Sequence, residues 1–124
     1  MRILVVDDDH FSLLAIARPL RKAGYEVVEA LKAEQIVAEA EKGSFDIAVI
    51  DIFMPGMGGI EAIQRIHAKS PNCKIIAMTG GFGDMPAEDT LAAAKKIGAD
   101  IGYEKPVPTE DLLQRVAAWA AERA

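Results

Sequence analysis

The chain has 124 residues, of which 51% are hydrophobic and 27% are charged. This composition indicates one globular domain and excludes a disordered or fibrous chain. The formal net charge of −5, without a run of Lys and Arg, argues against a nucleic-acid or anionic-membrane surface. The single cysteine excludes an internal disulfide, no apolar run approaches the ~20 residues that cross a bilayer, and no signal peptide is evident, so we expect a cytoplasmic protein.

The chain begins with a strand pattern that is followed by a helix pattern. Ile3–Val6 is a wholly apolar run, which is typical of a strand buried on both faces of a sheet. A helical stripe follows over Leu13–Leu20, and Gly24 is expected to end that helix. Pro19 lies inside the stripe, where we expect it to remove one backbone hydrogen bond and bend the helix.

The same alternation continues to the end of the chain. Further strands are predicted over residues 26–29, 47–50, 75–78 and 101–103, and the alternating pattern of the first favours a position near a sheet edge. Further helices are predicted over residues 33–42, 60–69, 89–97 and from 109 onward. These strand–helix repeats predict one α/β domain over residues 1–124, with five helices around a five-stranded parallel sheet.

Polar side chains follow four of these strands at the point where each strand ends. In chain order they are Asp7, Asp8, Asp9, Asp51, Thr79 and Lys105. Because the carboxyl ends of parallel strands meet at one edge of a sheet, we expect most of these groups to surround one pocket. Asp9 is the exception, and we expect it to act only as a helix cap or a solvated acid.

The chemistry of such a pocket follows from its charges. Crowded carboxylates repel one another unless a cation joins them, and oxygen ligands without a His/Cys cluster favour Mg²⁺. A metal, an ammonium and a hydroxyl together suit a small, multiply anionic group, and a phosphoryl group fits best. A carboxylate in the middle of the pocket can act as nucleophile and form an acyl phosphate.

Several separated motifs resemble the receiver domains of two-component response regulators. They are Val-Val-Asp-Asp at residues 5–8, Asp-x-x-Met-Pro at 51–55 with Gly59, Thr79, and Lys105-Pro106. The resemblance covers the whole chain in the right order. It implies a flavodoxin-like, doubly wound fold with sheet order 2-1-3-4-5. It also implies a phosphoaccepting signalling domain of the stand-alone, chemotaxis-regulator-like kind rather than an enzyme with a turnover substrate.

The resemblance implies a role for each acid of the pocket. Asp51 is expected to be the phosphoacceptor. Asp8, Asp51 and the backbone carbonyl of Phe53 are expected to bind Mg²⁺ directly. Asp7 is expected to bind the ion through water, and Mn²⁺ can substitute for Mg²⁺.

The resemblance also implies the remaining contacts and the partners. Lys105 would pair with the phosphoryl group, and the Thr79 hydroxyl would move to bond it. Gly80 and Pro106 would support the site, and we expect a cis peptide before Pro106 that aims Lys105. The expected phosphodonor is a sensor histidine kinase or a histidine phosphotransfer protein. A monomer or weak dimer would then bind a downstream target protein, with no nucleic acid or membrane involved.

Two departures from the family pattern are visible. Gly102 stands where a switch aromatic is usual, and Tyr103 lies one residue later, on the opposite face of the strand. The interval from Thr79 to Lys105 is about four residues longer than usual, which predicts a long loop over residues 80–86. By the resemblance, Phe53 and Gly81 occupy the two positions that often align the attacking water in the family; neither offers a group that could do so, and we therefore expect slow hydrolysis of the acyl phosphate.

The sequence leaves three alternative functions. An aspartyl phosphohydrolase usually has a second Asp two residues after the nucleophile, where this chain has Phe53. A receiver-like module that works without phosphorylation would be expected to lack an acid or the Lys. The third alternative is an N-terminal receiver fragment of a larger regulator with a separate output domain.

Overall fold

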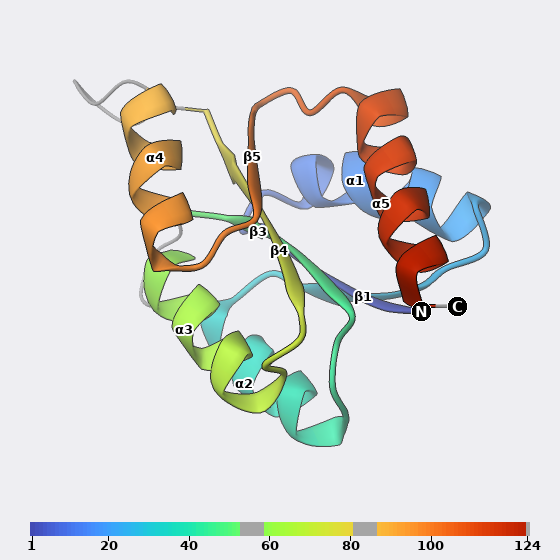
Figure 1. Cartoon of the computed structure of the whole chain (residues 1–124), viewed down its shortest axis with the longest axis horizontal. Helices are drawn as coiled ribbons and strands as arrows, with labels where there is room; N and C mark the ends of the chain where they lie inside the picture. The colour runs from blue at the N-terminus through green and yellow to red at the C-terminus, as the bar shows by residue number, and fades with distance from the viewer. Residues whose placement is uncertain (53–58, 81–86, 124) are drawn as a thin grey trace.

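The computed structural model describes residues 1–52, 59–80 and 87–123, and it contains a five-stranded sheet in the order β2-β1-β3-β4-β5 (Figure 1). Every neighbouring pair of strands is parallel, which confirms the predicted α/β fold and the predicted strand order. The strands are β1 (Arg2–Val6), β2 (Glu26–Ala30), β3 (Ile47–Asp51), β4 (Lys74–Thr79) and β5 (Ile101–Glu104). The helices are α1 (His10–Lys22), α2 (Ala33–Lys42), α3 (Gly59–Lys69), α4 (Ala87–Ile97) and α5 (Thr109–Arg123).

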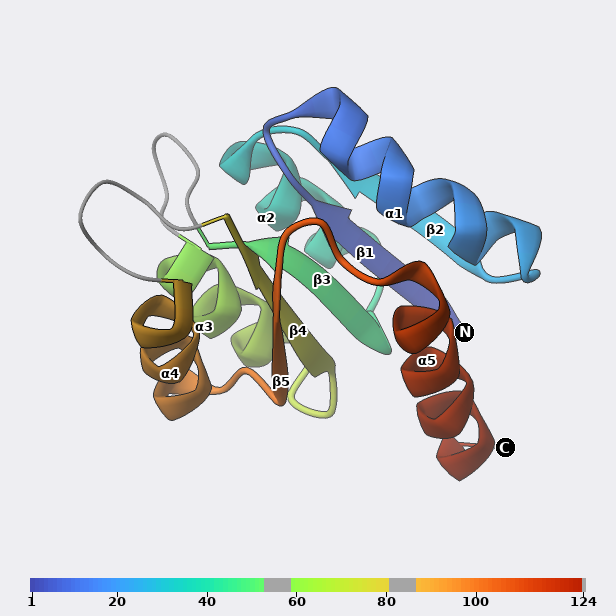
Figure 2. The same ribbon diagram turned by 90° about the horizontal axis from the view of Figure 1, so that it is seen from above.

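The helices cover both faces of the sheet, as Figure 2 shows from above. Leu4 and Val6 of β1 belong to a core that also holds buried residues of α2, α3 and α4. Ile3 and Val5, which point the other way, belong to a second core with α1 and α5. Because both faces are covered, the whole Ile3–Val6 run is fully buried, which explains its continuous apolar sequence.

Helix α1 begins with a side-chain cap and continues past its proline. The Asp9 carboxylate accepts a hydrogen bond from Phe11 N at 3.1 Å, which confirms the expected capping role. Pro19 lies within the helix, whose inner face buries Leu13, Ile16, Ala17 and Leu20. Gly24 follows with φ 97°, the left-handed conformation that favours glycine, so the helix ends where the sequence indicates.

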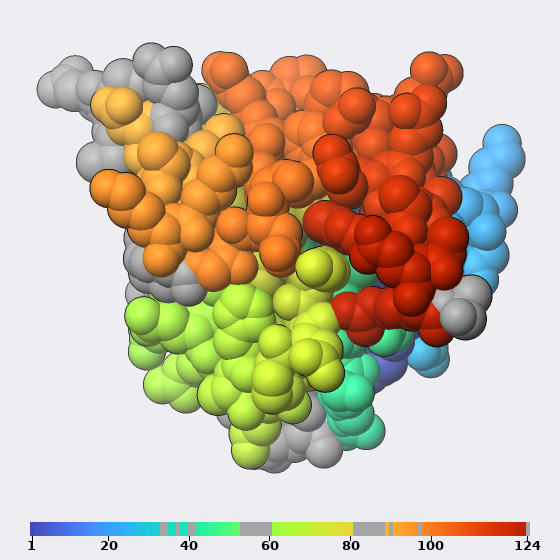
Figure 3. Space-filling model, in the orientation of Figure 1, coloured from blue at the N-terminus to red at the C-terminus, as the bar shows by residue number. Residues whose placement is uncertain are grey.

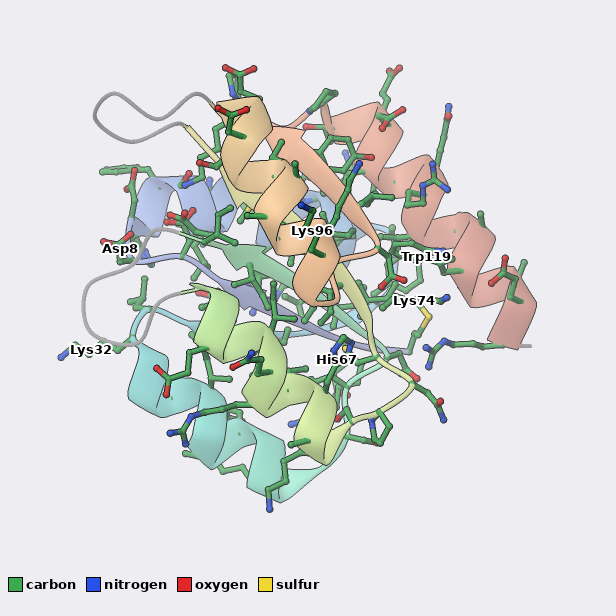
Figure 4. All side chains as sticks on the ribbon, turned by 60° about the vertical axis from the view of Figure 1, so that its left-hand side comes forward. Asp8, Lys32, His67, Lys74, Lys96 and Trp119 are labelled. Atoms are coloured by element: carbon green, nitrogen blue, oxygen red, sulfur yellow. The ribbon has the colours of Figure 1, made fainter. Side chains whose placement is uncertain are left out.

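The last helix buries the only tryptophan. Trp119, labelled beside the last helix in Figure 4, is 7% exposed and packs in the α1/α5 core. None of the helices in the described parts of the chain combines the length and the apolar character that a membrane span requires.

The two ends of the chain meet at the amino-terminal edge of the sheet. The Asp46 carboxylate accepts a hydrogen bond from Arg2 N and another from the Arg123 guanidinium, each at 2.8 Å. Arg123 also donates to the carbonyl of Asn72, just before β4. These bonds hold the last turn of α5 against the beginnings of β1, β3 and β4 (Figure 1).

Candidate functional site: an acidic cluster with a lysine

Four strands deliver the predicted polar groups to one edge of the sheet. Asp7 directly follows β1 and is fully buried, whereas Asp51 is the last residue of β3 and is 6% exposed. Thr79 ends β4 and is fully buried, and Lys105 directly follows β5. The structure therefore brings together groups that are up to 98 residues apart in the sequence.

Three carboxylates form the centre of this edge. Asp7, Asp8 and Asp51 each place an oxygen atom within 4.8 Å of the others, which is the one such group of potential metal ligands found among the described residues. Asp8 is exposed at the rim, beside the start of α1 in Figure 4. Oxygen donors at this spacing fit a hard divalent cation such as Mg²⁺, so the cluster could bind a metal ion.

Lys105 supplies positive charge to the same cluster. Its Nζ donates to Asp7 Oδ2 at 2.7 Å and to Asp51 Oδ2 at 3.1 Å. Burial by itself lowers the pKa of this ammonium, but the hydrogen bonds and charges of Asp7 and Asp51 outweigh burial and raise the pKa above its ordinary value. Lys105 therefore stays charged at neutral pH.

Backbone hydrogen bonds fix the positions of these side chains. Asp9 N donates to Asp7 Oδ1 at 2.9 Å, so the carboxylate of Asp7 is held from two sides. Lys105 N donates to the carbonyl of Thr79 at 2.8 Å, which extends the β4–β5 pairing by one residue. The peptide bond between Lys105 and Pro106 is cis, as predicted.

Part of the predicted site lies outside the described residues. Phe53, whose carbonyl was predicted as a metal ligand, belongs to residues 53–58, and Gly81 with most of the predicted 80–86 loop belongs to residues 81–86. The slow hydrolysis expected from Phe53 and Gly81 therefore stays a prediction. Gly80 is described and exposed, and a Cβ added there would meet no atom within 4 Å.

A contact between α4 and β5 was missed by sequence reasoning. A Cβ built on Gly102 would lie 2.8 Å from Leu91 Cδ2 and 3.2 Å from Leu91 Cβ. Leu91 of α4 thus occupies the space that a side chain at position 102 would need. Gly102 itself was a visible signal, because glycine in a strand often marks a close approach of another element.

A second missed contact joins β5 to α5. The Tyr103 hydroxyl donates to Asp111 Oδ2 in the first turn of α5. Burial, together with the hydrogen bond and the charge of Asp111, raises the pKa of Tyr103 to about 12, although the Arg115 guanidinium lowers it. No periodicity in the sequence relates a strand residue to a residue of the following helix, so this pair carried no signal.

Comparison with known proteins agrees with this geometry. Residues 3–117 match the family model described as the response regulator receiver domain. The chemotaxis protein CheY of Thermotoga maritima is 40% identical over 96 residues, which cover 76% of this chain and 80% of that protein. The solved structure of a CheY-like receiver domain protein from Methanospirillum hungatei JF-1 has a TM-score of 0.84 and 35% identity, covering 98% of this chain and 94% of that one.

Other relatives are much longer than this chain. A cyclic di-GMP phosphodiesterase of Thermotoga maritima is 34% identical over 118 residues, which cover 94% of this chain but 30% of that protein. The chain covers only 17% and 48% of two further curated relatives. The family model spans residues 3–117, and the chain accordingly belongs to the response regulator receiver domain family.

Proposed function

We propose that this chain is a phosphoaccepting response regulator that receives a phosphoryl group on Asp51 in the cytoplasm. The donor is the phosphohistidine of a sensor histidine kinase or of a histidine phosphotransfer protein. The observation that carries the proposal is the cluster of three carboxylates within 4.8 Å of one another, two of which bind one lysine ammonium. Such a cluster combines a nucleophile with the positive charge that phosphoryl transfer needs.

The proposed transfer uses a carboxylate oxygen of Asp51 as the nucleophile. A bond forms between this oxygen and phosphorus, and the nitrogen–phosphorus bond of the donor breaks. The donor imidazole keeps the electron pair of the broken bond, and an acyl phosphate forms on Asp51. Asp51 suits this role because it ends a central strand and retains 6% exposure, whereas Asp7 is fully buried.

The remaining acids would hold the metal. Asp8 and Asp51 would bind Mg²⁺ directly with the backbone carbonyl of Phe53, and Asp7 would bind it through water; Mn²⁺ is the alternative ion. When bound, the metal would supply positive charge to the phosphoryl oxygens. The exposed position of Asp8 leaves its carboxylate accessible to an entering ion.

Lys105 and Thr79 would contact the phosphoryl group. Lys105 Nζ donates a hydrogen bond to Asp51 Oδ2, so a phosphoryl oxygen on Asp51 could accept a hydrogen bond from the same ammonium. Thr79 would donate its hydroxyl to a second phosphoryl oxygen. Gly80 and Pro106 would support these contacts, because they follow Thr79 and Lys105, whose backbones are joined by a hydrogen bond.

Output would use the surface formed by α4, β5 and α5. Figure 3 shows the side chains of α4 and α5 on this face, with the segment after β5 running between them. Leu91 fills the space above Gly102, so we propose that α4 moves as a unit when the site is phosphorylated and thereby changes affinity for a downstream target protein. The protein would act as a monomer or weak dimer.

A second candidate is that residues 1–124 form the receiver part of a larger regulator with a separate output domain. This chain matches only 30% of the length of the cyclic di-GMP phosphodiesterase, in which the similar segment is part of a longer protein. This observation favours the second candidate. Reading the coding sequence beyond codon 124 distinguishes the two candidates.

The proposal is tested by intact-mass analysis after incubation with acetyl phosphate or phosphoramidate and Mg²⁺. We expect one added phosphoryl group on the wild type and none on Asp51→Asn. Asp89→Asn, which changes an exposed acid of α4, is the matched control and should be labelled like the wild type. Full labelling of Asp51→Asn would disprove the assignment. Continuous release of phosphate from a simple ester would instead favour a phosphohydrolase.

A further inference from the structure

The connection between β5 and α5 carries Lys105, and a hydrogen bond closes this connection. Tyr103 lies near the end of β5, two residues before Lys105, and its hydroxyl donates to Asp111, which is eight positions further along the chain. Figure 1 shows the connection arching from the end of β5 to the start of α5. Lys105 therefore sits on a short segment whose two ends are tied to each other.

Tyr103 also lies in the same row of the sheet as the proposed phosphoacceptor. In the parallel register, Met78 of β4 pairs with Asp51 on one side and with Tyr103 on the other. The ring of Tyr103 packs against the α1/α5 core, and its hydroxyl donates to Asp111 of α5. Strand pairing thus fixes the position of the Tyr103 ring, and the hydrogen bond from its hydroxyl fixes the first turn of α5 relative to β5.

The rest of the connection leaves Lys105 few other positions. Its backbone N–H is held by the Thr79 carbonyl at 2.8 Å. Pro106 and Pro108 restrict the backbone that follows, since proline fixes its own φ. The carbonyl of Pro108 accepts a hydrogen bond from Leu112 N at 3.0 Å, which joins the end of the connection to α5.

We propose that Tyr103 and Asp111 are positioning residues that hold the Lys105 segment, and through it the Lys105 ammonium, in place at the acidic cluster. Neither residue is expected to touch the reacting atoms. Losing their hydrogen bond would let the segment move, so Lys105 would spend less time within bonding distance of Asp7 and Asp51. The expected effect on phosphorylation rests on the proposed function. The expected effect of this hydrogen bond on the Lys105 backbone is independent of that function.

The first test measures hydrogen exchange of the Lys105 amide by NMR in the unphosphorylated protein. Tyr103→Phe removes the hydroxyl but keeps the ring, and Asp111→Ala removes the acceptor. Each change should speed exchange of the Lys105 amide by about tenfold, the size expected for one hydrogen bond to a charged group. Asp111→Asn keeps an acceptor oxygen and should restore most of the protection.

The matched control is Glu110→Ala, which removes the neighbouring acid of the same first turn. If Asp111 acted only through its charge at the start of α5, both alanine variants would speed exchange equally, and the proposal would be overturned. The double variant Tyr103→Phe/Asp111→Ala should exchange no faster than Tyr103→Phe alone, because that variant already lacks the hydroxyl that Asp111 accepts from. Additive effects would also overturn the proposal.

The second test measures the rate of labelling by acetyl phosphate at saturating Mg²⁺. Tyr103→Phe and Asp111→Ala should slow labelling several-fold, while the Mg²⁺ concentration for half-maximal stabilisation should stay at the wild-type value. If acetyl phosphate does not label the wild type, the proposed function is contradicted. The role of the Tyr103–Asp111 hydrogen bond would still be decided by the exchange of the Lys105 amide. Unchanged exchange at Lys105 in both variants would contradict the positioning role alone.

Discussion

Lys105 Nζ lies closer to Asp7 Oδ2, at 2.7 Å, than to Asp51 Oδ2, at 3.1 Å. Asp7 is fully buried, whereas the side chain of Lys105 is 23% exposed. Without this cation the carboxylate of Asp7 would be a buried charge without compensation, so losing the Lys105 ammonium should destabilise the fold. The bond to Asp51 is the one that a phosphoryl group could replace.

Replacing Lys105 by Met keeps an apolar stem and removes the ammonium from Asp7. We expect the free energy of unfolding at pH 7 to fall by about 2 kcal/mol, because one charge of a largely buried pair would lose its partner. Urea unfolding monitored by circular dichroism measures the loss.

Lys74→Met is the control for this experiment. Lys74 lies 4.0 Å from Asp100 in an ion pair whose side chains are 39% and 35% exposed, so its loss should cost less than about 1 kcal/mol. Adding Asp7→Asn to Lys105→Met should recover part of the stability. Equal losses from the two lysine variants would show that the Lys105–Asp7 pair has no special role.

Mg²⁺ should stabilise the protein because the acidic cluster exists only in the folded state. At a concentration about 100-fold above the dissociation constant, binding to the native state alone adds about 2.7 kcal/mol. Thermal unfolding with increasing Mg²⁺ measures this effect as a rising Tm. Asp8→Ala should lose most of the rise, whereas Asp89→Ala should keep it. A wild-type Tm that does not respond to millimolar Mg²⁺ would rule out the site.

Gly102→Ala should push α4 away from β5. Its Cβ would meet Leu91 at 2.8 Å, so Leu91 or the helix must shift, and we expect a loss of about 1–3 kcal/mol. Hydrogen exchange should quicken in α4 and less so in α1. Leu91→Ala removes the contacts with Cδ2 and Cγ but keeps Leu91 Cβ at 3.2 Å, so Gly102→Ala should cost clearly less in that background than in the wild type. A similar loss in both backgrounds would show that Leu91 is not the obstacle.

Cys73 should resist alkylation in the folded protein. Burial, together with the charges of Asp46 and Asp100, raises the pKa of its thiol from 9.0 to about 12, although Arg123 lowers it. Because the folded pKa is the higher one, the unfolded thiol ionises first as the pH rises. Its contribution to stability is therefore complete below pH 9 and is lost between pH 9 and about 12.

Iodoacetamide labelling followed by mass analysis checks this expectation. At pH 9 the native protein should react far more slowly than the same protein unfolded in guanidinium chloride, since Cys73 is 4% exposed. Equal rates would show that the thiol is accessible in the native state.

The fold was predictable because its central strands are apolar on both faces and end in polar residues. Ile3–Val6 followed by Asp7, and Ile47–Ile50 followed by Asp51, indicate both the parallel sheet and the edge where the acids meet. The contacts that could not be predicted depend on how the helices and side chains pack on that sheet. The preference of Lys105 for Asp7 over Asp51 is a matter of 0.4 Å in side-chain placement, which no spacing in the sequence encodes.

The hydrogen bond from Arg123 to Asp46, beside the start of β1, indicates where a label can be attached to this protein. Met1 and Arg123 line the same surface hollow, at the end of the sheet opposite to the acidic cluster. A fluorophore on Met1 would therefore lie about one strand length away from Asp51. Labels on Met1 and on an exposed residue of the last turn of α5 would report separation of α5 from β1, since Arg2 and Arg123 both bind Asp46 in the folded state.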